Sequence, residues 1–341
     1  MKRSLAVLVV SSFLAAAAQA DTIKVPADFG TIQQAVDNAG LNDSIVVSKG
    51  TYPENVLITG KSSLSLRAKG KVIVSGNAAE QAIGVFNSDH ITLKGFSLTG
   101  GTLFRVVFSV CSDSRITKCK IGGGPGDGLA ISDCMRMTVD KNQVGGVDSY
   151  GIRVESITFS SLLSSSGAID STFTKNRVQD TGDSGMRLQV LNCSVTKNRV
   201  IHAGGNGIEF LGPAMSSKNR VIEADVNGVV VESANVSLIK DKVTRSADDA
   251  FELKNPNCAL EKCSATRAGA DGFRLLFTAT GNALTKCKSN HAGGDGFEID
   301  GTTNTLVKCK ATQSGVFGLN DTSGGATNTY THCNFDSSNL P

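Results

Sequence analysis

Tryptophan is absent from this sequence, and aromatic residues make up only 5% of its 341 residues. This scarcity argues against binding sugars mainly by stacking, although acidic sugars can be held by charge. Proline is also scarce, with six residues, whereas glycine occurs 37 times. Abundant glycine with little proline favours many tight turns between short strands.

A strong charge of either sign is missing as well. The formal net charge is +3, which gives no electrostatic case for a nucleic-acid partner. No apolar run beyond residue 20 is long enough to cross a membrane. We therefore expect neither a nucleic-acid partner nor a membrane span.

The first 20 residues differ from the rest in composition. Lys2 and Arg3 precede an apolar run over residues 5–18, and Ala18-Gln19-Ala20 forms a small-x-small end. This pattern predicts a secretory signal peptide over residues 1–20. The mature chain, residues 21–341, is then secreted or periplasmic.

A repeat of 21 to 24 residues runs through most of the chain. One marker is the residue after Thr-Lys or its equivalent, and a second is a glycine before an apolar residue. Both take the same steps, including one long step of 34 residues. Two markers that agree through nine units indicate an array of repeated structural units. The first marker runs through Cys119, Asn142, Asn176, Asn198, Asn219, Asp241, Cys263, Cys287, Cys309 and Cys333.

Each unit contains short alternating runs and no helical pattern. Ile208 and Phe210, for example, alternate with Glu209 and Leu211, and a period of two indicates a strand. Two or three such strands per unit predict an all-β fold in which each unit is one coil of a parallel β-helix. The long step predicts a protruding loop at about residues 156–169, which either walls a groove or is neutral.

Residues 29–40 form the one amphipathic helix expected in the mature chain. Ile32, Ala35 and Val36 mark its apolar stripe, and Gly40 ends it. An open β edge recruits other chains unless it is covered. We therefore expect this helix to cap the N-terminal end of the β-helix.

The region from residue 22 to residue 70, together with the repeats, resembles the secreted right-handed β-helix proteins of the pectin-lyase-like superfamily. The resemblance includes the cap helix and the first coil, Ile-Val-Val-Ser-Lys-Gly-Thr-Tyr-Pro-Glu-Asn-Val. It implies a single-domain right-handed parallel β-helix of about eleven coils over residues 21–341. The superfamily contains lyases, hydrolases, esterases, epimerases, binding proteins and a copper-maturation accessory factor. The catalytic motifs of its esterase, polygalacturonase and alginate epimerase families have no match, and Gly50–Glu54 is interpreted as turn chemistry.

Residues at equal positions in successive coils are neighbours in such a fold. The Asn and Cys markers predict an inward ladder in which Asn hydrogen-bonds along the rod and Cys fills apolar space. Disulfides such as Cys263–Cys287, or a thiolate metal stack, are the alternatives. A second ladder either shapes turns or holds Ca²⁺. It comprises Asp127, Asn206, Asn227, Asp249, Asp271 and Asp295.

The residues that follow the repeat glycines predict an outward ladder. Its charges either neutralise one another on a solvated face or line a sugar-binding groove. The first outward positions are Ala130, Arg153, Arg187, Glu209, Val230, Glu252, Arg274, Glu298 and Asn320.

The groove interpretation places a site for β-elimination around Lys254 and Arg274. Lys254 serves as the catalytic base because the neighbouring Arg274 lowers its pKa. Carboxylates hold Ca²⁺ against the substrate carboxylate, with Glu252, Glu298 and Asp300 as ligands. The candidate substrate-binding residues are Arg153, Arg187, Glu209, Glu252 and Glu298.

The sequence thus predicts an exported, monomeric β-helix protein that binds an acidic polysaccharide and, if it is an enzyme, cleaves it as a polysaccharide lyase. Ca²⁺ is the one cofactor considered. A non-enzymatic structural, adhesion or glycan-binding β-helix is the first alternative. A periplasmic accessory protein for metal or cofactor maturation is the second, and the absence of closely paired histidines weighs against it.

Overall fold

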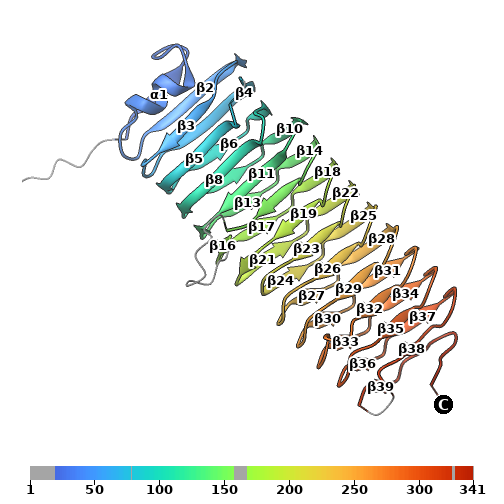
Figure 1. Cartoon of the computed structure of the whole chain (residues 1–341). Helices are drawn as coiled ribbons and strands as arrows, with labels where there is room; N and C mark the ends of the chain where they lie inside the picture. The colour runs from blue at the N-terminus through green and yellow to red at the C-terminus, as the bar shows by residue number, and fades with distance from the viewer. Residues whose placement is uncertain (1–19, 78, 157–166, 325–326, 341) are drawn as a thin grey trace, which may run out of the picture.

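The chain forms a long β-solenoid with one short helix at its N-terminal end (Figure 1). This computed structural model describes residues 20–77, 79–156, 167–324 and 327–340. The predicted signal peptide, apart from Ala20, and most of the predicted loop at 156–169 lie outside the described residues. No helix in the described part of the chain is long and apolar enough to cross a membrane.

Three strands make up a typical coil, and equivalent strands pair in parallel from coil to coil to form three stacks. Stack 1 comprises β1 (Thr22–Val25), β2 (Ser44–Tyr52), β4 (Ser65–Gly76), β6 (Thr92–Lys94), β9 (Arg115–Thr117), β13 (Thr138–Asp140), β17 (Thr172–Thr174), β21 (Cys193–Thr196), β24 (Ala214–Ser217), β27 (Ser237–Ile239), β30 (Ala259–Glu261), β33 (Ala283–Thr285), β36 (Thr305–Val307) and β39 (Thr329–Thr331).

Stack 2 follows in each coil and begins with the second halves of β2 and β4. It continues through β7 (Ser97–Gly100), β10 (Lys120–Gly124), β14 (Gln143–Val147), β18 (Arg177–Thr181), β22 (Arg199–Ala203), β25 (Arg220–Ala224), β28 (Lys242–Ser246), β31 (Ser264–Thr266), β34 (Lys288–Asn290) and β37 (Lys310–Thr312).

Stack 3 closes each coil. It comprises β3 (Val56–Thr59), β5 (Gln81–Asp89), β8 (Phe104–Ser112), β11 (Asp127–Ser132), β15 (Ile152–Val154), β19 (Met186–Leu188), β23 (Ile208–Phe210), β26 (Val229–Val231), β29 (Phe251–Leu253), β32 (Phe273–Leu275), β35 (Phe297–Ile299) and β38 (Asn320–Asp321). Three short strands pair beside it: β12 (Cys134–Met135), β16 (Ala168–Ile169) and β20 (Val190–Leu191).

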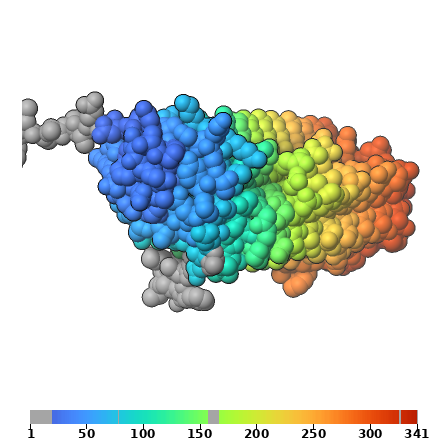
Figure 2. Space-filling view, turned by 90° about the horizontal axis from the view of Figure 1, so that it is seen from above, coloured from blue at the N-terminus to red at the C-terminus, as the bar shows by residue number. Residues whose placement is uncertain are grey.

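The all-β parallel solenoid predicted from the repeat is confirmed. Fourteen stack 1 strands joined by successive parallel pairings make 13 turns, so the expected count of about eleven coils is low. The count is low because the coils before Cys119 lack the Asn or Cys marker. Figure 2 shows that the N-terminal coils, in blue, are bulkier than the coils that follow, and that the surface behind them is hollowed along the rod.

The core is a column of inward side chains from all three stacks. Ile208 and Phe210 are buried as their alternation predicts. Further along stack 3, the rings of Phe251, Phe273 and Phe297 lie directly over one another with centroids 4.8 Å apart. This spacing equals the distance between neighbouring strands, so the aromatic stack repeats with the coil.

The cap helix α1 (Ile32–Asn38) covers the N-terminal end, with Ile32, Ala35 and Val36 buried. It is shorter than the predicted 29–40, because Thr31 caps its first turn and Ala39 is already extended. The Glu54 carboxylate accepts hydrogen bonds at 2.9 Å from the backbone N–H groups of Ile32 and Gln33. Glu54 therefore caps the helix and has a structural role.

The C-terminal residues cover the other end of the rod. Phe335 packs edge-on against Phe297 with ring centroids 5.6 Å apart. Leu319, which is fully buried, forms a parallel bridge with Ser338. The final segment thus closes the aromatic column without a helix, which the sequence did not predict.

The predicted asparagine ladder is present at the turn between stacks 1 and 2. Asn176 is buried, its Nδ2 donates to Asn198 Oδ1 at 3.0 Å, and its backbone N–H donates to the same oxygen at 2.9 Å. Asn142 and Asn198 repeat this pattern. Each amide thus satisfies a backbone group that burial would otherwise leave unpaired.

The cysteine part of the ladder is a continuation of the same turn. All nine cysteines are free, and the Cys263 thiol lies 3.4 Å from the Leu238 carbonyl oxygen. Cys287 and Cys309 make the equivalent contact to the preceding coil. Their role in the structure is the predicted one of buried apolar filler.

Asp241 stands at the end of the asparagine ladder, and its substitution tests the ladder. Burial raises the pKa of Asp241 to about 6, although hydrogen bonds from Ser216 and Asn219 lower it. A carboxyl whose pKa is raised by folding costs stability as pH rises from its ordinary value to its folded one. We expect Asp241→Asn to raise the free energy of unfolding by about 1–3 kcal/mol at pH 8 and to have little effect at pH 4.

Urea unfolding of Asp241→Asn and the native protein at both pH values measures this difference. The matched control is Asp225→Asn, at an exposed position, where we expect no pH-dependent gain. An equal effect of Asp241→Asn at pH 4 and pH 8 would contradict the interpretation.

Candidate functional site

Strand register places the predicted outward ladder in a single line on stack 3. Arg153 pairs with Arg187 in the next coil, and Arg187 pairs with Glu209. Further along, Arg274 lies between Glu252 and Glu298. The ladder is therefore confirmed as a row of neighbouring side chains about 4.8 Å apart, here called the stack 3 face.

Three members of the row are more buried than an outward position implies. Val230 is 1% exposed, Glu209 is 5% exposed and Ala130 is 7% exposed. Val230 carries no charge and divides the row into two charged clusters. The predicted site residues therefore do not form one group, because Arg153, Arg187 and Glu209 lie on one side of Val230 and the others lie beyond it.

The first cluster is held by hydrogen bonds to Glu209. Arg187 Nη1 lies 2.6 Å from Glu209 Oε2, while the Ser184 hydroxyl and the Asn206 amide donate to Oε1 at 2.5 and 2.9 Å. The Arg187 guanidinium also lies 5.9 Å from the ring centroid of Tyr150. Both oxygens of the carboxylate are thus engaged, which favours a structural role for Glu209.

Arg153 belongs to the same cluster. Its Nε lies 3.2 Å from Asp127 Oδ2 and 3.6 Å from Glu155 Oε2. Its guanidinium also faces the ring of Tyr150 at 5.6 Å. Tyr150 is a residue that sequence reasoning missed, because it stands just before the repeat glycine at a position that holds Asp or Asn in most coils.

Lys254 lies in the second cluster between two glutamates. Its Nζ is 2.9 Å from Glu232 Oε1 and 3.5 Å from Glu252 Oε2, and the Asn227 amide also donates to Glu252 Oε2 at 3.1 Å. Burial lowers the pKa of Lys254, but Glu232 and Glu252 raise it more, so the pKa lies above its ordinary value. The expectation of a lowered pKa is therefore wrong, and Lys254 is a cation rather than a base near neutral pH.

Arg274 and Glu298 form the centre of the second cluster. Arg274 Nε lies 3.3 Å from Glu298 Oε2 but makes no hydrogen bond, and this Nε is the one buried side-chain N or O atom without a partner among the described residues. The two side chains remain partly open to solvent, at 37% and 19% exposure. The cluster thus holds a partly exposed arginine, whose buried Nε lacks a hydrogen-bond partner, beside a carboxyl group.

Buried aspartates lie behind this pair. Asp249 and Asp271 each accept a backbone N–H from the next coil, at 2.9 and 2.6 Å, so the predicted turn-shaping role is observed. Burial, followed by the neighbouring Asp271, raises the pKa of Glu298 to about 8. Burial and the charges of Asp271 and Asp248 raise the pKa of Asp249 to about 7. Glu298 is therefore protonated at neutral pH, because burial disfavours its charged form and the neighbouring Asp271 disfavours a second negative charge.

The predicted calcium ligands are not gathered into a site. Glu252 and Glu298 are separated by the strand of Arg274, and Asp300 accepts a hydrogen bond from Thr322. In the part of the chain that the structure describes, no three His, Cys, Asp or Glu side chains could hold a metal ion. The calcium hypothesis gains no geometric support.

Comparison with solved structures identifies proteins of the same shape. The chain is similar to the A-module of a mannuronan C-5 epimerase of Azotobacter vinelandii, with 12% identity, a TM-score of 0.70, and coverage of 91% of this chain and 94% of that one. It is also similar to a DFA-IIIase of Arthrobacter chlorophenolicus A6 without its lid, with 14% identity, a TM-score of 0.62, and coverage of 84% of this chain and 94% of that one. A surface adhesin of Streptococcus pneumoniae matches at 11% identity, with a TM-score of 0.58 and coverage of 92% of this chain and 91% of that one. At these identities the likeness establishes the fold alone.

A curated relative matches over a shorter stretch. It is a cell surface glycoprotein of Methanothermus fervidus, 28% identical over 99 residues, which cover 28% of this chain and 16% of that protein. The match spans much less than two thirds of the relative.

The family with the description "right handed beta helix region" matches residues 54–215 and 212–339. These two segments cover most of the solenoid and agree with its parallel stacks. The chain therefore belongs to the right-handed β-helix family.

Proposed function

We propose that the chain binds an acidic polysaccharide along the stack 3 face and cleaves it by β-elimination at the cluster of Glu252, Arg274 and Glu298. The observation that carries this proposal is the order of the three side chains on neighbouring strands. A carboxylate, an arginine with an unused donor and a protonated carboxyl group follow one another about 4.8 Å apart.

Each of the three groups matches a requirement of the reaction. Arg274 neutralises the carboxylate of the sugar, which makes the C5 proton easier to remove. Glu252 accepts that proton, and Glu298 gives its own proton to the leaving oxygen. Lys254 is held by Glu232 and Glu252. In this proposal it is not the base predicted from the sequence; it contributes a second positive charge to substrate binding.

The protonated state of the cluster supports an anionic substrate. Below pH 7, Asp249 and Glu298 both retain their protons, so they do not neutralise Arg274. A sugar carboxylate then pairs with Arg274 without opposition from these two groups. The fold that the chain shares with a mannuronan C-5 epimerase is compatible with this use of the face.

Arg274→Ala tests the proposal with polygalacturonate and alginate as substrates. We expect the rate of unsaturated product formation, followed by ultraviolet absorbance, to fall about 100- to 1,000-fold, since one group that stabilises developing charge is lost. Arg136→Ala is the matched control, because it removes an arginine paired with Asp113 that lies six coils from Arg274 along the rod. Loss of activity in both variants, or in neither, would contradict the assignment.

A non-enzymatic glycan-binding protein is the second candidate. Several charged side chains of the stack 3 face already have ion-pair partners, namely Arg187 with Glu209 and Lys254 with Glu232. Such pairing favours a stabilised surface over a reactive one. In addition, the curated relative is a cell surface glycoprotein. Retardation of the protein in a polysaccharide-containing gel, with no unsaturated product and no new reducing ends, would support this candidate over the lyase.

A further inference from the structure

A lysine occupies the turn between stacks 1 and 2 in nine consecutive coils. Every one of these lysines is exposed and has a positive φ of 54° to 60°. The turns stack through backbone hydrogen bonds to the next coil, so the lysines follow one another about 4.8 Å apart. They are Lys118, Lys141, Lys175, Lys197, Lys218, Lys240, Lys262, Lys286 and Lys308.

The backbone of this turn does not explain the choice of lysine. Left-handed conformations favour Gly, Asn and Asp. At the far end of stack 2, a second row of residues with φ of 51° to 62° carries acidic, basic and neutral side chains in the same coils. These residues are Asp180, His202, Glu223, Arg245, Arg267, His291 and Gln313. The same geometry thus tolerates varied residues at one turn, while the other turn holds lysine throughout.

A second basic row runs beside the lysines on stack 2. Its members are the first outward residues of successive strands and are neighbours by register. Gln143 and Ser264 are the only neutral members over these nine coils. The basic members, all exposed, are Lys120, Arg177, Arg199, Arg220, Lys242, Lys288 and Lys310. These seven residues and the nine turn lysines are here called the basic face.

Few carboxylates oppose these charges. Lys141 pairs with Asp140 at 3.0 Å and Lys262 pairs with Glu261 at 2.5 Å. The other fourteen members of the basic face form no ion pair within the described residues. The whole chain has a net charge of only +3. The basic face therefore concentrates positive charge that carboxyl groups elsewhere balance, and a ladder rich in these carboxyl groups lies on stack 3.

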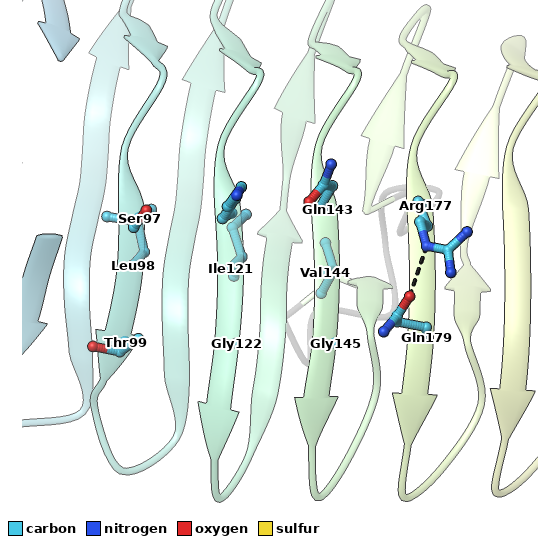
Figure 3. A pocket seen from close by; sticks show the side chains of 11 residues that line it. Ser97, Leu98, Thr99, Ile121, Gly122, Gln143, Val144, Gly145, Arg177 and Gln179 are labelled. Carbon is cyan, nitrogen blue, oxygen red and sulfur yellow. Dashed lines mark hydrogen bonds between the residues drawn. The ribbon is translucent and has the colours of Figure 1, made fainter. Parts of the chain in front are cut away.

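The neutral members of the row lie at hollows in the basic face. Near Gln143, Gly122 and Gly145 leave bare backbone between β10 and β14, with Arg177 beside it on β18 (Figure 3). The second hollow lies at Ser264, where lysines surround the short side chain. They are Lys242, Lys262, Lys286, Lys288 and Lys308.

We propose that the basic face binds a linear acidic polysaccharide with one carboxylate per sugar, which lies parallel to the axis of the rod. An extended sugar chain advances per sugar by a distance close to the ~4.8 Å step of one coil, so the axial spacing of its carboxylates is similar to that of the lysine row. The nine coils of the face span about 38 Å, enough for about eight or nine sugars. This face is separate from the stack 3 face, so the inference does not depend on the proposed function.

Nucleic acid fits the face less well. Duplex DNA carries a charge about every 1.7 Å along its axis, which does not match the coil repeat. Single strands are usually held by aromatic side chains that stack on the bases, and neither row of the basic face contains an aromatic residue. A regular row of cations without stacking partners favours the acidic polysaccharide.

The test removes three adjacent turn lysines in the triple variant Lys197→Gln, Lys218→Gln and Lys240→Gln. We expect its affinity for polygalacturonate, measured by calorimetry in low salt, to fall about 10- to 100-fold. For the native protein, affinity for oligogalacturonides should rise with length up to about eight or nine sugars and then level off. It should also fall steeply with added salt.

A second triple variant controls for net charge. Arg136→Gln, Arg245→Gln and Arg267→Gln together remove the same number of charges away from the lysine row, and we expect polygalacturonate affinity to stay within about twofold of native. Equal losses in both triples, or duplex DNA binding more tightly than polygalacturonate at equal salt, would overturn the proposal. Turnover of short substrates should survive the lysine triple and be lost in Arg274→Ala, which separates this inference from the proposed function.

Discussion

Phe273→Ala is expected to lower the free energy of unfolding by about 3–5 kcal/mol. The ring is fully buried and stacks on Phe251 and Phe297 at 4.8 Å on either side, with interplanar angles of 4° and 6°. Its removal leaves a cavity that neighbouring coils cannot close, because the hydrogen-bonded strands fix their spacing. Urea unfolding followed by circular dichroism measures the loss.

Phe277→Ala is the matched control for this substitution. Phe277 follows the same strand, β32, yet it is 75% exposed, so its removal should change stability by no more than about 0.5 kcal/mol. In a solenoid each coil is stabilised mainly by its neighbours. The C-terminal coils should therefore unfold first in Phe273→Ala, and equal effects of the two substitutions would refute the role given to the aromatic column.

Glu298→Gln is expected to lower the rate of unsaturated product formation about 100- to 10,000-fold. The amide keeps the shape of the side chain but has no acidic proton for the leaving oxygen. Because the pKa of Glu298 is raised to about 8, the native rate should fall as pH rises through about 8, when the active protonated form is lost. The residual rate of Glu298→Gln should lack this step in its pH profile.

Glu261→Gln provides the comparison for this variant, since it removes an exposed carboxylate on stack 1, outside the candidate site. We expect its rate and pH profile to equal those of the native protein. A native-like rate in Glu298→Gln, or a pH step near 8 that persists in that variant, would exclude Glu298 as the proton donor.

The candidate site could be predicted only in part from the sequence. Equal spacing placed Arg274 between Glu252 and Glu298, and the strand register confirms that order. Spacing also placed Glu232 one coil before Lys254, but it could not show that Glu232 and Glu252 outweigh the effect of burial and raise the pKa of Lys254. That balance depends on burial and on distances in the folded coil, so the predicted lowering of this pKa was wrong.

The coil repeat was sufficient for the fold. Alternation identifies strands, and a constant step of about 22 residues lets every coil form the same hydrogen bonds with the next. The solenoid therefore follows from the sequence, as do its inward Asn and Cys ladders and its outward charged row. The lysines of the basic face were visible in the Thr-Lys marker itself.

Tertiary structure alone decided the states of the charged groups. Burial of Asp249 and Asp271 behind Glu298 sets which carboxyls hold protons, and the exposure of the lysine row shows where positive charge is unopposed. Both depend on desolvation and on distances between coils. The sequence determines which residues repeat, whereas only the folded coil determines which of them are buried, paired or free to bind.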